Sequence, residues 1–184
     1  MGDSYFVHAR WFAIEANRLN LGLHGAEVSW LGERGLRWLG GFQSYVDPLL
    51  QGRTPPDVLC LHLGGNDLGS SVQKHSLPIV MQRDLERIHS AHPLMRIVFS
   101  LINERAAWRA PDHPIRPLNR MRQFVNREMV KNVEKMGGTT VDHPQIRHDN
   151  LELYHRDQCH LSDLGRGLFF DNIAQAIAAA IQRC

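Results

Sequence analysis

The chain has 184 residues, of which 43% are hydrophobic, which is enough for one domain with a full core over residues 1–184. Its 21 Lys and Arg residues against 19 Asp and Glu residues give a formal net charge of +2, too small and too dispersed to indicate a nucleic-acid-binding surface. No stretch approaches the roughly 20 consecutive apolar residues that a membrane-spanning helix needs.

The cysteines bear on the cellular setting. Cys60, Cys159 and Cys184 cannot form an even disulfide framework, and no secretory signal pattern opens the sequence. These two observations favour a reducing, cytoplasmic setting.

The first predicted helix covers residues 5–17, where apolar and aromatic residues recur at helical spacing. Ser4 would then stand at the start of this helix. Backbone amides and the positive end of the helix dipole favour an anion there, such as a tetrahedral acyl intermediate. A plain N-cap role is the alternative for this serine.

A second group of elements follows a turn-rich connection. Alternating residues 26–31 predict a strand, and residues 36–50 predict a helix. Residues 57–63 form a nearly continuous apolar run, as expected of a parallel strand that is buried on both faces. His62, within this run, is predicted to be a core histidine.

The segment Gly64-Gly65-Asn66-Asp67 follows that strand, at the edge where open α/β sheets bind their ligands. The Asn66 side chain could donate a hydrogen bond to a developing oxyanion, a contact worth on the order of 3 kcal/mol of barrier in acyl transfer. An Asx-turn is the alternative for Asn66. Asp67 is predicted to brace neighbouring loop amides.

Helices and strands also alternate in the second half of the chain. The predicted ranges are 77–89, 95–102, 118–136, 139–142 and 161–181. With no internal repeat and no linker, this order predicts a single three-layer α/β/α domain with a parallel sheet. Four arginines within or just before the range 118–136 are predicted to form a solvated face: Arg116, Arg120, Arg122 and Arg127.

A long loop over residues 103–117 suits a lid or the wall of an acyl pocket. Arg105 and Trp108 are its candidates for substrate contacts, and packing is the equal alternative.

The segment Asp157-Gln158-Cys159-His160 precedes the last helix. An acidic residue three positions before a histidine can hold the imidazole in one tautomer and direct its other nitrogen at a nucleophile. Cys159 as the nucleophile is an alternative, although no separate base accompanies it. A zinc site is another alternative, but its ligand spacing matches no common pattern. The ligands of that site would be His148, His155, Cys159 and His160.

Three blocks in this order resemble the SGNH, or GDSL-type, hydrolases: Gly2-Asp3-Ser4, Gly64-Gly65-Asn66-Asp67 and Asp157-Gln158-Cys159-His160. The wider sequence around the last two blocks is similar to the esterase domains in first-reading-frame proteins of vertebrate LINE retrotransposons. It is also similar to acetylhydrolases of the platelet-activating-factor type. The resemblance covers essentially the whole chain.

This family has one more block, a lone glycine after the second strand, for which Gly35 is the best candidate and Gly32 the second. The resemblance implies a flavodoxin-like three-layer fold in which a buried strand leads into the first block. Because only Met1 precedes Gly2, that first strand is expected to be missing or truncated.

The resemblance implies a serine esterase that cleaves short-chain acyl esters of the acetyl type, including lipid esters, without a metal or organic cofactor. Ser4 would be the nucleophile, His160 the base and Asp157 its orienting carboxylate. The Ser4 and Gly35 amides and the Asn66 side chain would form the oxyanion hole. The alternative is a catalytically inactive, retroelement-derived interaction or lipid-binding module, which the absent first strand favours.

Overall fold

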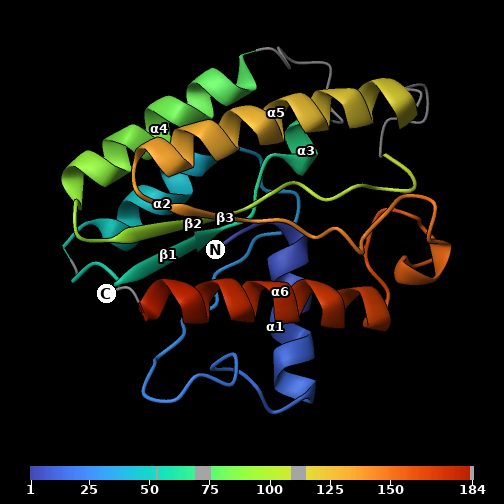
Figure 1. The fold of residues 1–184 in the computed structure, drawn as a ribbon, viewed down its shortest axis with the longest axis horizontal. Coiled ribbons are helices and arrows are strands. Elements are labelled where there is room, and N and C mark those ends of the chain that lie inside the picture. The colour runs from blue at the N-terminus through green and yellow to red at the C-terminus, as the bar shows by residue number, and fades with distance from the viewer. Residues whose placement is uncertain (53, 69–75, 109–114, 183–184) are drawn as a thin grey trace.

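The structure, a computed structural model, describes residues 1–52, 54–68, 76–108 and 115–182, and has three layers (Figure 1). The middle layer is a parallel sheet in the order β1-β2-β3, made of β1 (Val58–Leu61), β2 (Arg96–Ser100) and β3 (Thr139–Val141). The predicted three-layer fold with a parallel sheet is confirmed.

The helices cover both faces of the sheet. They are α1 (Ser4–Glu15), α2 (Phe42–Leu50), α3 (Gly65–Leu68), α4 (Leu77–Ala91), α5 (Ile115–Lys135) and α6 (Asp163–Ile181), with a 3-10 turn at Leu151–Leu153. Figure 1 shows α2, α4 and α5 on one side of the sheet and α1 and α6 on the other. No helix of the described ranges is both long enough and apolar enough to cross a membrane.

Two hydrophobic clusters explain why the strand sequences are apolar throughout. Leu59 and Phe99 pack into the cluster beneath α2, α4 and α5, whereas Cys60 and Val98 pack into the cluster beneath α1 and α6. Because successive side chains of a strand point to opposite faces, a strand buried on both faces needs an apolar residue at nearly every position.

The region between α1 and α2 differs from the sequence prediction. Residues 26–31 form no named strand, and the predicted helix over 36–50 begins only at Phe42. The amides of Trp38 and Leu39 donate hydrogen bonds to the carboxylate of Asp67, at 2.8 and 2.9 Å. These two hydrogen bonds hold the residues before α2 in turns. The left-handed backbone of Gly40, with φ of 85°, separates these turns from α2.

Residues 1–3 lie between two extended segments and pair with both. On one side, Gly2 N donates to Leu31 O at 3.0 Å; on the other, His62 N donates to Met1 O at 3.0 Å. Gly2 forms parallel bridges with both Gly32 and His62. Backbone hydrogen bonds on both sides therefore hold in place the segment that leads to Ser4.

A chain of hydrogen bonds runs through the core beneath α6. Ser100 Oγ lies 2.8 Å from His62 Nδ1 and 2.8 Å from His143 Nε2, and Asn172 meets the other nitrogen of His143 at 3.1 Å. His62 is 2% exposed, as expected of a core histidine. Burial lowers the pKa of His143 to about 3 and the pKa of His62 well below its usual value.

Both histidines are therefore expected to make stability depend on pH. Each binds a proton more readily in the unfolded chain, with a pKa near 6.5, than in the folded chain. Stability is thus fully present above that value and falls as the pH drops toward the folded pKa. Between pH 7 and pH 5, His143 alone should cost about 2 kcal/mol of the free energy of unfolding.

Urea unfolding at these two pH values measures this loss. Carboxylates contribute little in this window because their unfolded pKa values lie near 4. The His143→Gln variant should show a smaller difference between pH 7 and pH 5. An equal difference in the variant would contradict the assignment to His143.

Candidate active site

Ser4 is the first residue of α1, and its neighbours fix how the chain enters that helix. Asp3 is fully buried and caps the helix, because its Oδ1 accepts a hydrogen bond from Tyr5 N at 3.0 Å. A Cβ atom at Gly2 would lie 2.6 Å from the carbonyl oxygen of His62. A glycine is therefore required where the chain passes β1 and turns into α1.

Asn66, in the short helix α3 after β1, reaches toward this helix start. Its Nδ2 donates to Leu36 O at 3.0 Å and to Asp3 Oδ2 at 3.3 Å. Asn66 thus joins the first block of the chain to the turns before α2. Asp67 braces loop amides as predicted; burial raises its pKa, although the two amide hydrogen bonds oppose this.

The two glycine candidates have different surroundings. A Cβ atom at Gly32 would lie 2.9 Å from Val7 Cγ2, so Gly32 allows close packing against α1. Gly35 has φ of 77° and nothing within 4 Å of its Cβ position. It directly precedes Leu36, the residue whose carbonyl oxygen accepts from Asn66. Of the two glycines, Gly35 is the one with open space at its Cβ position, next to the residue that Asn66 contacts.

Asp157 and His160 lie in a tight loop closed by a bridge between Tyr154 and Leu161. Asp157 Oδ2 lies 2.5 Å from His160 Nδ1, and Asp157 Oδ1 accepts from the amides of Cys159 and His160 at 3.1 and 3.0 Å. Partial burial raises the pKa of Asp157, but these hydrogen bonds outweigh it and lower the pKa to about 2. The carboxylate therefore stays ionised and holds the imidazole by Nδ1, which leaves Nε2 to act.

A hydrogen bond brings this loop to α1. Tyr5 Oη donates to Cys159 O at 2.8 Å, which joins the residue after Ser4 to the residue before His160. The His8 ring centroid lies 5.2 Å from that of His160, and His8 lies one turn after Ser4 on the same face of α1. Within the described residues, Ser4 Oγ and His160 are not hydrogen-bonded, and such contacts are often loose in unliganded sites.

Arg105 and Trp108 are buried behind this site, at 3% and 6% exposure. The Arg105 guanidinium lies 3.8 Å from Asp3 Oδ2, 5.5 Å from the Tyr5 ring centre and 5.0 Å from the Trp108 ring centre. This placement favours the packing alternative over direct substrate contact. The rest of their loop, residues 109–114, lies outside the described residues.

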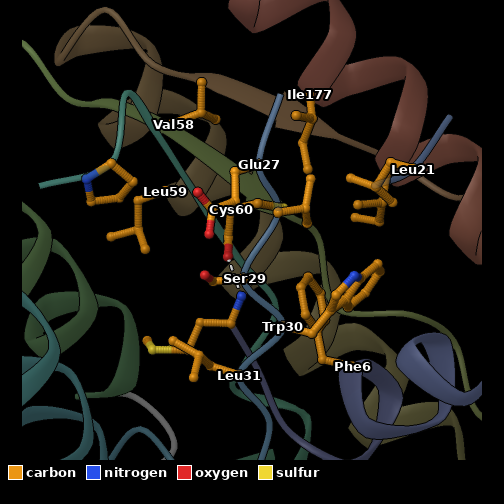
Figure 2. Close-up of a pocket in the computed structure, with 14 residues that line it drawn as sticks. Phe6, Leu21, Glu27, Ser29, Trp30, Leu31, Val58, Leu59, Cys60 and Ile177 are labelled. Carbon is orange, nitrogen blue, oxygen red and sulfur yellow. Dashed lines mark hydrogen bonds between the residues drawn. The ribbon is translucent and has the colours of Figure 1, made fainter. Parts of the chain in front are cut away.

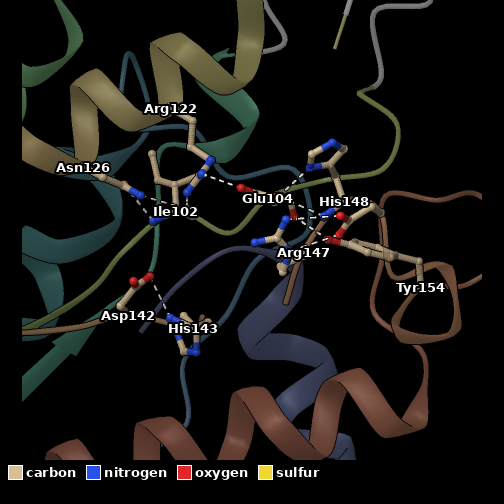
Figure 3. Close-up of polar contacts among 10 residues, drawn as sticks. Ile102, Glu104, Arg122, Asn126, Asp142, His143, Arg147, His148 and Tyr154 are labelled. Atoms are coloured by element: carbon tan, nitrogen blue, oxygen red, sulfur yellow. Dashed lines mark hydrogen bonds and ion pairs between the residues drawn. The ribbon is translucent and has the colours of Figure 1, made fainter. Parts of the chain in front are cut away.

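A polar cluster centred on Glu104 includes Tyr154, whose bridge with Leu161 closes the loop of His160 (Figure 3). Glu104 pairs with Arg122 at 3.0 Å and with His148 Nδ1 at 2.6 Å, and its carbonyl oxygen accepts from Tyr154 Oη at 3.0 Å. The prediction that Arg122 belongs to a solvated face is wrong. Arg122 is 9% exposed because its guanidinium satisfies Glu104 and the Ile102 carbonyl.

The geometry of this loop does not support the two alternatives, a cysteine nucleophile and a zinc site. Cys159 is 5% exposed, and its carbonyl oxygen accepts a hydrogen bond from Tyr5 Oη. The possible zinc ligands do not converge, since no three metal-ligating side chains gather anywhere in the described ranges.

Sequence reasoning missed the role of Asp3, which links Asn66, Arg105 and the start of α1. The available signal was its position two residues before the predicted range 5–17, since aspartate is a preferred N-cap and the helix begins at Ser4.

No protein-family model matches this sequence, and no curated protein matches it. Solved structures do match over nearly the whole chain. A member of the lipolytic protein G-D-S-L family from Veillonella parvula has a TM-score of 0.70 at 14% identity, covering 96% of this chain and 95% of its own. A GDSL-like lipase from Bacteroides thetaiotaomicron has a TM-score of 0.69 at 15% identity, covering 100% and 86%.

A carbohydrate esterase of family 3 from Talaromyces cellulolyticus has a TM-score of 0.65 at 14% identity and covers 100% of this chain and 97% of its own. These matches agree with one another in architecture, and their low sequence identities make them evidence of fold. The chain has the fold of the GDSL-type, or SGNH, hydrolases.

Proposed function

We propose that this chain is a serine esterase that hydrolyses short-chain acyl esters, of the acetyl type, with Ser4, His160 and Asp157 as its catalytic triad. The observation that carries the proposal is the hydrogen bond between Tyr5 and Cys159, which places the paired Asp157 and His160 beside the start of α1. The solved structures of the same fold that are named as lipases and esterases support it.

The mechanism follows from the chemistry of these groups. His160 Nε2 takes the proton of Ser4 as Oγ attacks the ester carbonyl, and Asp157 stabilises the imidazolium that forms. The amides of Ser4 and Gly35 hold the oxyanion together with the side chain of Asn66, whose amide exchanges its 3.3 Å contact with Asp3 Oδ2 for the oxyanion. His160 then protonates the leaving alkoxide, and water releases the acyl group by the same path.

Two narrower features are proposed from the sequence. The chain is related to the esterase domains of LINE first-reading-frame proteins, and it acts in the cytoplasm on a small-molecule or lipid ester.

A fluorophosphonate probe tests the nucleophile directly, because it reacts with an activated serine. The expected result is one adduct per chain, located on Ser4 by peptide mass spectrometry and absent from Ser4→Ala. Ser44→Ala, on the exposed face of α2, is the matched control and should be labelled as fully as the parent chain. A folded parent chain that takes no label would refute the esterase proposal.

Asn66 is expected to contribute to kcat through the oxyanion. Asn66→Ala should lower kcat for p-nitrophenyl acetate by about 10²- to 10³-fold with a much smaller change in KM, because the lost contact forms mainly in the transition state. The melting temperature must be measured beside the kinetics, since Asn66 also donates to Leu36 O and Asp3. A fall in kcat below tenfold would remove Asn66 from the oxyanion hole.

A further inference from the structure

Three ring side chains lead away from the proposed catalytic histidine along α1. The His8 ring centroid lies 5.2 Å from that of His160, and the Trp11 ring stacks on His8 with its centroid 5.2 Å away. We call His160, His8 and Trp11 the aromatic row. Arg34 stands at its end, because its guanidinium carbon lies 4.9 Å from the centre of the Trp11 ring.

The far end of the aromatic row is open to solvent. Trp11 is 40% exposed, and Arg34 is exposed as well. Trp11 lies two helical turns after Ser4, about 10 Å along the axis of α1. A substrate that reacts at Ser4 can therefore extend over His8 and Trp11 and reach Arg34.

Arg34 is held in position from two sides. Its backbone directly precedes Gly35, whose amide is proposed for the oxyanion hole, and its side chain lies over the Trp11 ring. A guanidinium that stacks on an aromatic ring uses its face for that contact and keeps its N–H edge free to donate hydrogen bonds. The N–H groups of Arg34 are thus available to a ligand at the end of the aromatic row.

The charge of Arg34 has no carboxylate partner within the described parts of the chain. Other exposed arginines do have one. Arg18 pairs with Asp171 at 3.0 Å, and Arg87 pairs with Asp47 at 2.7 Å. Arg34 therefore differs from them in offering an uncompensated positive charge beside the candidate active site.

The surroundings of His8 show the same excess of positive charge. Burial is the main cause that lowers the pKa of His8 to about 4, followed by the charges of His160, Arg166, Arg34 and His155. The two arginines stay protonated at any ordinary pH. Arg166 forms an ion pair with Asp163, so Arg34 is the one of the two whose charge is left to attract an anion.

An apolar pocket of about 180 Å³ elsewhere in the protein does not suit an anion. It lies between β1 and the extended segment 27–31 (Figure 2). It shares no lining residue with the aromatic row, and Glu27 supplies the only charged side chain among its described lining residues. Since Glu27 repels anions, Arg34 is the better site for them.

We propose that Arg34 binds a carboxylate on the alcohol part of the ester substrate. This inference rests on the esterase function proposed above. His160 protonates the leaving alkoxide, so the alcohol part lies on the side of Ser4 where the aromatic row begins. It extends over His8 and Trp11. A single guanidinium without a partner matches one carboxylate, through two parallel N–H···O hydrogen bonds.

Two esters that differ only in charge test this proposal: 3-(4-acetoxyphenyl)propanoate and its primary carboxamide. Both release acetate, and their phenols have nearly equal reactivity because methylene groups separate the end group from the ring. We expect kcat/KM at low ionic strength to be about five- to tenfold higher for the carboxylate. In Arg34→Gln this ratio should fall below about twofold, and Arg34→Lys should keep part of it.

Arg10→Gln is the matched control. Arg10 is exposed on the same helix and has the same charge, but no contact joins it to the aromatic row within the described residues. Its replacement should leave the ratio of the two kcat/KM values unchanged. An equal loss of the ratio in Arg10→Gln would show a general effect of surface charge and overturn the proposal. If Arg34→Gln slows both esters equally, Arg34 serves the oxyanion or the fold, and the proposal is also overturned.

Binding to Ser4→Ala separates this proposal from the esterase function. Calorimetric titration with the same two esters should give a Kd about five- to tenfold lower for the carboxylate, and adding Arg34→Gln should abolish the difference. If the parent chain hydrolyses neither ester while Ser4→Ala keeps this difference, the esterase proposal fails and the carboxylate site stands. If the parent chain hydrolyses both esters equally well, the esterase proposal stands and the carboxylate site is wrong.

Discussion

Replacing His160 with glutamine is expected to lower kcat for p-nitrophenyl acetate by about 10⁴- to 10⁶-fold with the fold intact. Glutamine keeps much of the volume of histidine but cannot take the proton of Ser4 at neutral pH. Asp157→Asn should cost about 10⁴-fold, because an amide that donates to Nδ1 would fix the wrong tautomer. Steady-state kinetics, with circular dichroism of each variant, measure both effects.

His155 provides the matched control, since it lies in the same loop and contacts Arg166 rather than Asp157. His155→Gln should change kcat by less than about threefold, as expected of a side chain outside the reaction path. The double variant His160→Gln with Ser4→Ala should be no slower than either single variant, because the two residues act as one unit. Additive losses would show that His160 does not serve Ser4.

Replacing Gly165 with alanine is expected to destabilise the protein by about 3 kcal/mol or more. A Cβ atom there would lie 2.3 Å from Leu153 O and 3.2 Å from Leu161 Cβ. Backbone atoms cannot rotate away, so the start of α6 must move relative to the loop of His160. Both the melting temperature and kcat should therefore fall.

Gly167 lies two residues further along α6 and provides the contrast. A Cβ atom at Gly167 would meet only the Phe12 ring, at 3.4 Å from Cζ and 3.6 Å from Cε2, which is near ordinary contact. Gly167→Ala should be neutral or stabilise by up to about 1 kcal/mol, because alanine is the better helix former. Equal losses in the two variants would show that helix propensity or flexibility, and not the contact with Leu153, decides the outcome.

The parts of the fold that the sequence predicted well are those with a strong local pattern. The apolar runs of β1 and β2 and the helical period of α4 each determine their own structure through burial on one or two faces. The start of α6 was also readable, because Ser162 accepts from Gly165 N as an N-cap.

The errors occur where a distant residue decides the local structure. The sequence near Trp38 and Leu39 contains no signal that their amides bind the carboxylate of Asp67, so residues 36–41 were predicted to be helical. Arg122 has the spacing of an exposed arginine. Its guanidinium is nevertheless buried, because it donates a hydrogen bond to Glu104, 18 residues before it in sequence. Arg105 likewise meets Asp3 only in the folded chain.

The candidate site could be found from sequence because its residues lie in short blocks of distinctive composition. Their mutual arrangement could not, since Tyr5, which ties the blocks together, looked like an ordinary core residue of α1. Its hydroxyl group gives no sequence signal for its partner, a backbone carbonyl that any residue could supply.

The hydrogen bond between Tyr5 and Cys159 spans 154 residues of sequence. Closing so long a loop costs conformational entropy that only the assembled sheet and helices can repay, so this contact is expected to form late in folding. Before α6 docks, Tyr5 and Cys159 cannot meet, so the serine proposed as the nucleophile is expected to become reactive only in the assembled fold.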